Sequence, residues 1–249
     1  MINASTFAPV RYCLAGLTLT SLLLFVLSAA FAQTSVRLQP AIGVALSYAS
    51  ISGSKSDFRP RVLPHAGVNI LVPVDGGVSI KTGVLYQQKG WHVHSSTVDT
   101  DQYRTEFYGT VKLHELTIPL QLQYAHSAGR SFTYSMAAGV SYDFTLLAEN
   151  DLTIETYKGE KLRGTQTASW NPYIGLIPDD SRLKSSFDGT AYYLFNPSLR
   201  LEAGVQWKKR YGAQVYWEHS INSVNATYGN TTPIKVGCLG ISLSVFLGR

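Results

Sequence analysis

The sequence predicts an all-β fold: a closed, eight-stranded, antiparallel up-and-down barrel that crosses a membrane. Three observations lead to this prediction. They are an apolar leader at the N-terminus, eight later segments in which apolar and polar residues alternate, and connections that are long and tight in strict turn. Alternation with a period of two gives a strand one apolar and one polar face. Connections of alternating length are typical of an up-and-down sheet whose two ends face different compartments.

Residues 1–32 match a cleaved secretory signal peptide. Leu14–Leu27 is an apolar run behind a positive n-region, and Ala30-Phe31-Ala32 is the small-x-small pattern before a cut at Gln33. The competing interpretation is a single membrane anchor, but the run is short of the roughly 20 residues that a spanning helix needs. We therefore expect an exported protein whose barrel domain comprises residues 33–249.

Four strands are expected in the first half of the mature chain. Val36–Ala49 sets a row of aliphatic side chains against Gly, Ala, Ser and Gln, about Val62–Val72 is the least regular segment, and Val78–Gln88 sets Val, Ile and Tyr against Ser, Lys, Gly and Gln. The fourth strand is the clearest, because large apolar residues occupy every second position of Glu115–Tyr124. These residues are Leu116, Ile118, Leu120, Leu122 and Tyr124.

Four more strands follow in the second half. Phe132–Leu146 alternates aromatic and aliphatic residues with Thr, Ser, Gly and Asp, and about Tyr192–Trp207 alternates Leu, Val and Trp with Ser, Arg, Glu and Gln. Tyr211–His219 carries Val and Trp against Gln, Tyr and Glu. Val236–Leu247 ends the pattern with Leu, Ile and Val against Gly and Ser. The total of eight predicts a narrow barrel, just wide enough for side chains to fill.

The composition of the two faces decides which of them points outward. The apolar faces carry scarcely a charge, and only 15% of the chain is Asp, Glu, Lys or Arg. A soluble, secreted barrel of lipocalin type, one of the alternatives, would need more charge on its outer surface. A membrane barrel points its apolar face to lipid and its polar face into the lumen. It must also be closed, because an open sheet edge in lipid leaves backbone N–H and C=O groups without partners.

The connections also predict an orientation. Outer-membrane barrels keep short turns in the periplasm and long loops outside, so we expect both chain ends in the periplasm. The longest connection predicts an extracellular insert at about 147–190, whose alternating residues on either side of Gly159 suggest a hairpin beyond the membrane. The expected long loops are Ser50–Arg61, Gly90–Thr110, Leu147–Thr190 and Ile221–Pro233, and the tight turns are Pro73–Gly77, Ala125–Ser131 and Lys208–Gly212.

Aromatic residues gather near both ends of the predicted strands. Trp207 and Tyr211 lie beside a tight turn, whereas Trp91, Tyr192 and Trp217 lie toward the long loops. Amphipathic rings favour the two membrane–water interfaces. We therefore expect two aromatic belts on the outer wall.

Two segments carry recognisable motifs: Tyr86–Gly90 has the form Y-x-x-K-G, and Leu116–Tyr124 has the form L-x-I-P-L-x-x-x-Y. With these motifs the chain resembles the porin-like, PorT-type outer-membrane β-barrel family of Gram-negative bacteria, and the later strand Tyr134–Tyr142 also fits. The resemblance covers essentially the whole mature chain. It implies an eight-stranded closed barrel in the outer membrane. It says little about activity, since most members have no assigned biochemical role and a few are tied to protein secretion.

Charged residues on the polar faces predict a network in the lumen. Unpaired charges in a narrow barrel are costly, so opposite signs should pair and be hydrogen-bonded. Such a network is either a structural plug, which we favour, or part of a path for ions or small solutes. Its candidate members are Lys81, Glu115, Asp143, Arg200 and Glu202.

Motifs for catalysis, metals or cofactors do not stand out. The sequence contains no glycine-rich phosphate loop and no paired cysteine motif. His92 and His94 share a face, but two ligands are too few for a closed zinc site. No spacing singles out a Ser, His or Asp for catalysis, so we predict no catalytic residue, no metal and no cofactor. Cys238 has no cysteine partner in the mature chain and is best explained as a small apolar filler.

These observations together predict a monomeric, non-enzymatic barrel of the bacterial outer membrane. Its environment is membrane lipid, and the export signal argues against nucleic acid as a partner. The leading hypothesis is a structural or partner-binding role, in which the extracellular loops contact other envelope proteins or the barrel assists an envelope or secretion process. The alternatives are a small-solute or ion pore and the soluble lipocalin-like barrel.

Overall fold

The computed structural model describes residues 36–51, 57–98, 103–176, 190–227 and 233–247, and the predicted signal peptide lies outside them. All regular structure in these ranges is β-strand. No helix among the described residues is long and apolar enough to cross a membrane.

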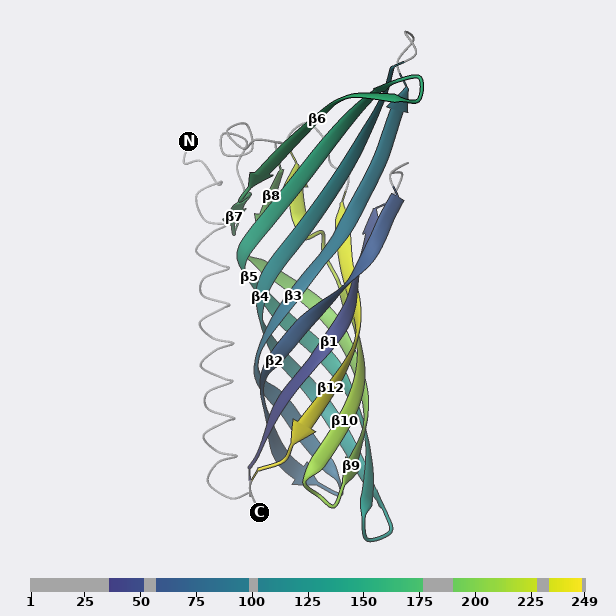
Figure 1. Ribbon diagram of the computed structural model, residues 1–249. Helices are drawn as coiled ribbons and strands as arrows, with labels where there is room; N and C mark the ends of the chain where they lie inside the picture. The colour runs from purple at the N-terminus through teal and green to yellow at the C-terminus, as the bar shows by residue number, and fades with distance from the viewer. Residues whose placement is uncertain (1–35, 52–56, 99–102, 177–189, 228–232, 248–249) are drawn as a thin grey trace, which may run out of the picture.

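Eight strands form a closed antiparallel ring, which confirms the predicted fold class (Figure 1). The first strand pairs with both the second and the last, and the fourth pairs with both of its neighbours, so the ring closes on itself. In ring order the strands are β1 (Arg37–Ile51), β2 (Asp57–Asp75), β3 (Val78–Val98), β4 (Tyr103–Ala128), β5 (Phe132–Lys158), β9 (Phe195–Trp207), β10 (Tyr211–Ser220) and β12 (Ile234–Val245).

Four further strands lie at the end of the barrel that carries the long connections (Figure 1). β6 (Lys161–Trp170) pairs with the outer part of β5. β7 (Tyr173–Gly175), β8 (Thr190–Tyr193) and β11 (Asn225–Thr227) form a small separate sheet. The single strand predicted at about Tyr192–Trp207 is therefore two, because β8 belongs to the small sheet and only β9 joins the ring.

The faces of the ring strands point as predicted. On β4, Leu122 is 64% exposed on the outer wall, while Gln121 and Gln123 beside it are buried inside the barrel. On β12, Ile241 is exposed and Ser242 is buried in the same way. The lipocalin-like hypothesis requires the opposite arrangement and is wrong.

The strands continue past several predicted loop boundaries. Ser50–Arg61 and Gly90–Thr110 were predicted as loops, but β1 and β2 run into the first interval and β3 and β4 into the second. The pairing of β3 with β4 continues to Val98↔Arg104. The apolar side chains of these strand ends, such as Trp91, Val93 and Phe58, belong to the core inside the barrel. Their apolar face is therefore the inner one, which differs from the lipid-facing pattern by which the strands were predicted.

The three predicted tight turns are confirmed. Gly76 and Gly77 join β2 to β3 with positive φ angles of 54° and 85°, which glycine adopts without a steric cost. Residues 129–131 join β4 to β5, and residues 208–210 join β9 to β10.

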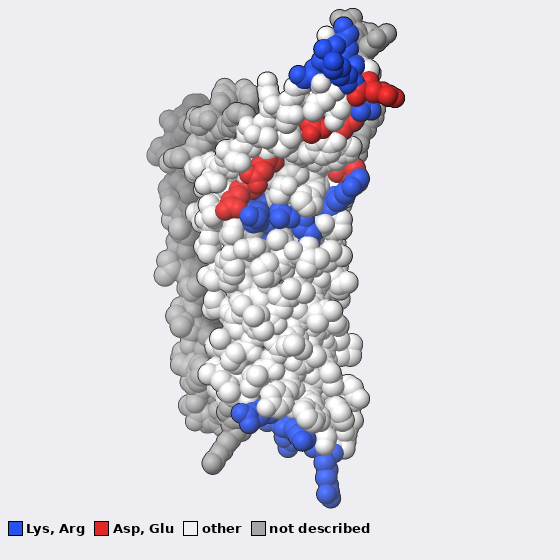
Figure 2. Space-filling view, viewed as in Figure 1, with Lys and Arg blue, Asp and Glu red and all other residues white. Residues whose placement is uncertain are grey.

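A wide band of the outer wall carries no charged side chain on the face shown in Figure 2. Outward-facing charges return at Lys112 of β4 and Glu149 of β5, which form an ion pair with 2.8 Å between Nζ and Oε2. From this pair β4 runs on to Tyr124 near the tight turns. The length of this segment is close to the roughly 9–11 residues that a tilted strand needs to cross the hydrocarbon of a membrane. The strands above the pair lie outside the membrane-spanning segments.

The barrel interior has an apolar layer toward the long connections. Trp91 and Tyr192, expected in the outer aromatic belt, are each 1% exposed and pack together inside, so that part of the prediction is wrong. Trp91 follows the buried Gln87 and Lys89 at a period of two, which places it on the inner face of β3. The other buried members of this layer are Val111, Leu113, Ala148, Val224 and Val236.

Candidate functional site

The centre of the lumen holds a cluster of buried charges around Lys89 of β3. The Nζ of Lys89 lies 3.0 Å from Glu115 Oε2, 2.7 Å from Asp143 Oδ2 and 2.6 Å from Glu218 Oε1. These carboxylates come from β4, β5 and β10, so one ammonium group ties four strands together across the barrel. All four side chains are buried.

The cluster continues toward the tight turns through Arg200 of β9. Its Nη1 donates a hydrogen bond of 2.8 Å to Glu218 Oε2, and its Nε lies 3.6 Å from Glu202 Oε2. Glu202 also accepts a hydrogen bond from Lys81, which reaches across from β3. The three cations and four carboxylates therefore form one continuous network.

Neutral side chains add hydrogen bonds to two of the carboxylates, Asp143 and Glu218. Thr117 and Ser198 donate to Asp143 at 2.7 and 2.8 Å, and Ser141 donates to Glu218 at 3.0 Å. Small hydroxyl residues on the inner faces thus satisfy lone pairs that the cations do not reach. Glu115 has fewer partners, since Lys89 is the only described residue that forms an ion pair with it.

The remaining space beside the cations is filled by neutral groups. The Tyr216 ring lies 4.0 Å from the Arg200 guanidinium carbon, and its hydroxyl is 3.2 Å from His65 Nδ1. Gln87 donates to the sulfur of Cys238 at 3.1 Å, and this thiol is buried and free. Cys238 packs in a small buried cluster with Ala45 and Tyr216, as expected of an apolar filler, and also borders the polar network.

The structure brings all five predicted lumen residues into this network, but sequence reasoning missed two others at its centre. Lys89 was left between the strand predicted to end at Gln88 and the loop predicted to begin at Gly90, so it was not placed on the inner face. Glu218 was placed on the polar face of its strand but was not grouped with the other charges. The position of Lys89 in the strand could have revealed it. Lys89 follows Gln87 by two positions, so the two side chains lie on the same face of the strand if the strand continues.

The strands above the membrane form a second polar site on the outer surface. We call residues 91–98 of β3, 103–113 of β4, 147–158 of β5 and 161–170 of β6 the extension sheet. Among its outward-facing side chains, Glu106 accepts hydrogen bonds from Tyr108 and lies 3.0 Å from Arg104 Nε. Tyr157 donates to Glu155 at 2.6 Å, and Arg104 lies over the Tyr157 ring.

These contacts shift the titration of the exposed groups. The hydrogen bond from Tyr108 lowers the pKa of Glu106 below its usual value, and the same bond raises the pKa of Tyr108 to about 12. The hydrogen bond to Glu155 likewise raises the pKa of Tyr157. The shifts mark paired surface groups, not an acid and base held apart for catalysis.

The two histidines weighed as metal ligands both face outward from the extension sheet. His92 Nδ1 lies 3.0 Å from Thr110 Oγ1, and the His94 ring stacks on Tyr108 with 4.9 Å between centroids. Within the part of the chain that the structure describes, no group of three or more His, Cys, Asp or Glu side chains is placed to hold a metal ion.

Comparison with known proteins now identifies the family. A profile of the outer membrane protein β-barrel domain matches residues 31–226, most of the chain. The chain belongs to this family. As an outer-membrane barrel it lies in the bacterial outer membrane, and membrane lipid surrounds its wall. The finer resemblance to PorT-type proteins stays a prediction.

Solved structures of outer-membrane barrels are similar at low identity. Ail of Yersinia pestis is 10% identical, with 86% of this chain and 100% of Ail covered and a TM-score of 0.32. OprG of Pseudomonas aeruginosa is 12% identical, with 86% and 95% covered and a TM-score of 0.40. The neisserial surface protein NspA is 10% identical, with 86% and 99% covered and a TM-score of 0.36. No curated protein matches the sequence.

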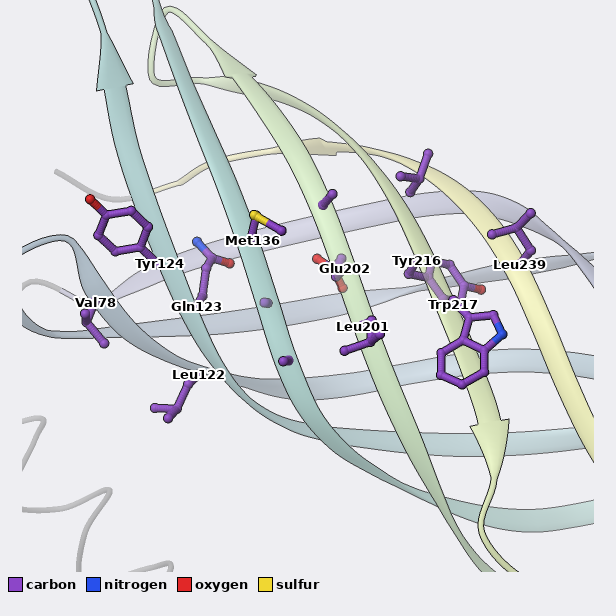
Figure 3. Close-up of a pocket in the computed structure, with 14 residues that line it drawn as sticks. Val78, Leu122, Gln123, Tyr124, Met136, Leu201, Glu202, Tyr216, Trp217 and Leu239 are labelled. Carbon is purple, nitrogen blue, oxygen red and sulfur yellow. The ribbon is translucent and has the colours of Figure 1, made fainter.

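The lipid-facing wall of the outer-membrane barrel contains a shallow apolar hollow of about 580 Å³ (Figure 3). Met136, Leu201 and Trp217 line it from three neighbouring strands, around the small residues Ala138 and Ala203. Glu202 and Tyr216 alternate with these residues and belong to the lumen network. The wall of the hollow is almost wholly apolar and fits the lipid chains that surround any membrane barrel.

Proposed function

We propose that this protein is a non-enzymatic, non-conducting outer-membrane barrel that holds a binding sheet above the membrane. The extension sheet is the part that contacts a partner, and the partner is an extended segment of another envelope protein. The observation that carries the proposal is the edge of β6.

β6 offers an unprotected strand edge. It pairs with β5 from Asn150↔Trp170 to Lys158↔Lys161, and no other described strand pairs with it. Proteins usually protect such edges with charges or proline. The stretch Gly164–Ser169 has neither, and most of its side chains are exposed. An extended peptide can therefore add to this edge through backbone hydrogen bonds.

The filled lumen supports the non-conducting part of the proposal. Lys81, Lys89 and Arg200 reach across a barrel only eight strands wide and are held by four carboxylates. Above them the layer around Trp91 and Tyr192 is apolar and closely packed. The pore hypothesis needs a continuous aqueous path through both layers.

Edge lysines test the binding role. In T165K/T167K, two lysines on exposed positions of β6 should protect the edge, and a photo-cross-linker at Gln166 should lose its adducts in intact cells. The matched control is T153K, which adds a lysine on the same face, opposite Thr167, but on the interior strand β5. Unchanged cross-linking in T165K/T167K, or equal loss in T153K, would contradict the proposal.

Planar-bilayer recordings test the closed lumen separately. The purified protein should insert without producing stable ion-selective steps. Such steps would favour the pore hypothesis and contradict the proposal that the lumen is closed. They would not affect the proposed binding at the edge of β6, which the cross-linking experiment tests.

A further inference from the structure

The turn between β9 and β10 has an unusual backbone. Lys208 and Lys209 have φ angles of +50° and +56°, and they are the non-glycine residues with positive φ among those that the structure describes. The Arg210 N–H donates to the Trp207 carbonyl at 3.1 Å and closes a β-turn with the two lysines at its centre. Hairpin turns with two left-handed residues strongly prefer Asn-Gly, because a Cβ is strained there.

The strained turn belongs to a strongly cationic rim. Arg37 at the start of β1 and Arg130 in the next hairpin turn lie at the same end of the barrel as Lys208, Lys209 and Arg210. The only acidic side chain described at this end is Asp75, and none of the five cations forms an ion pair with a described residue. On the face shown in Figure 2, the charged side chains at this end are all Lys or Arg.

Two aromatic rings place the rim at the membrane surface. Trp207 and Tyr211 are both half-exposed on the outer wall at the lower border of the uncharged band. Lys208 Nζ lies 4.5 Å from the Trp207 ring centroid, and Arg210 Cζ lies 5.7 Å from that of Tyr211. Rings of this kind occupy headgroup depth, and cations beside them extend their heads toward the polar layer.

A hollow at the barrel mouth adjoins the rim. It has a volume of about 350 Å³, and Arg37 and Lys209 line it together with the polar Gln206. Asp75 also lines it, so the hollow is not uniformly positive. Its size and its two cations suit an anionic headgroup next to the barrel wall.

We propose that the rim formed by Arg37, Arg130, Lys208, Lys209 and Arg210 is a binding site for the phosphate headgroups of anionic phospholipids. The two lysines occupy the strained left-handed positions of the turn, and this places their side chains at the depth where lipid phosphates lie. Clusters of basic residues beside membrane-spanning segments bind anionic lipids in this way. This site is independent of the partner-binding edge of β6.

The test uses the mature protein reconstituted in bilayers of phosphatidylcholine and phosphatidylglycerol at about 7:3, with spin-labelled versions of both lipids. The native protein should prefer phosphatidylglycerol at its wall, and the preference should fall as salt is added. K208N/K209G should reduce the preference by about fivefold for each lysine removed, about 25-fold in total, at low salt. The control K158Q/K161Q removes two lysines from the distant tip of the extension sheet and should keep the native preference.

A second readout separates charge from folding. K208N/K209G removes the backbone strain of the two left-handed lysines. The temperature at which the protein unfolds, measured by its shift in gel mobility on heating, should therefore rise by about 2–4 °C for each 1 kcal/mol of strain removed. K208R/K209R keeps the charge and should keep the lipid preference. A native preference in K208N/K209G, or equal loss in K158Q/K161Q, would overturn the proposal. So would abolition of the preference by about 10 mM inorganic phosphate at constant ionic strength, which would indicate a site for a free ion.

Discussion

The charged network makes one strong prediction about stability, tested by Lys89→Met. Lys89 is the contact that Glu115, Asp143 and Glu218 share, at 2.6 to 3.0 Å, and its side chain is 4% exposed. Its removal leaves three buried carboxylates close together, and among the described residues Arg200 is the one cation still in contact with any of them, through Glu218. Removal of one partner from a buried ion pair costs about 3–5 kcal/mol. We expect K89M to lower the free energy of unfolding by that amount, at least a hundredfold in the unfolding equilibrium.

The assay is urea unfolding of the barrel in lipid vesicles, followed by tryptophan fluorescence and by heat-modifiable gel mobility. The matched control is K112M, which breaks the Lys112–Glu149 pair on the outer surface, where both side chains are about one-third exposed. Solvent screens that pair, so the control should lose less than about 1 kcal/mol.

A double variant shows which part of the loss comes from uncompensated charge. Among the residues that the structure describes, Glu115 forms an ion pair with Lys89 alone, whereas Asp143 keeps two hydroxyl donors and Glu218 keeps Arg200 and Ser141. K89M/E115Q should therefore recover part of the stability lost in K89M. If K89M unfolds at the same urea concentration as K112M, the lumen network does not hold the barrel together and the reasoning is refuted.

Three further predictions follow from single groups. Cys238 is fully buried in the lumen, so maleimide should not label it in the folded barrel and should label it after urea unfolding; labelling of the folded protein would mean an open lumen. Tyr108→Phe should raise the pKa of Glu106 toward its ordinary value of 4.5, as measured by a carbon NMR titration of the glutamates. Because folding lowers this pKa, the stabilising effect of Glu106 is present above its unfolded pKa and is lost as the pH falls through the folded value, a loss that Y108F should lessen. N-terminal sequencing of the mature protein should begin at Gln33, and an intact leader would mean that the signal peptide is not cleaved.

The sequence predicted the ring of strands because the membrane imposes a simple rule on it. A strand between lipid and lumen must alternate, and Leu116 to Tyr124 on β4 do so without exception. The rule ends where the membrane ends. Above Lys112 the outer face of β4 carries Arg104 and Glu106, while the buried Val111 lies on its inner face. The apolar face therefore changes from outside to inside, and the rule for a lipid-facing strand could not predict how far the strand continues.

The inner side chains of the upper barrel were misplaced for the same reason. Trp91 was expected among lipid headgroups, since an aromatic residue near a strand end is typical there. Its parity with Gln87 and Lys89 places it inside instead, where it packs with Leu113 and Val236. Once β3 is known to continue past Lys89, its period of two gives the face on which each residue lies. The composition of the sequence alone does not show that the strand continues.

The lumen network shows a further limit, which lies in the geometry of barrels. Some of its contacts join neighbouring strands in register, such as Arg200 opposite Glu218 on β9 and β10. Others cross the lumen, such as Lys89 to Glu218 and Lys81 to Glu202. A contact across the lumen depends on the stagger accumulated around all the strands, which no local pattern encodes. The inner polar residues could therefore be named from sequence, while the central position of Lys89 could only be found once the ring was closed.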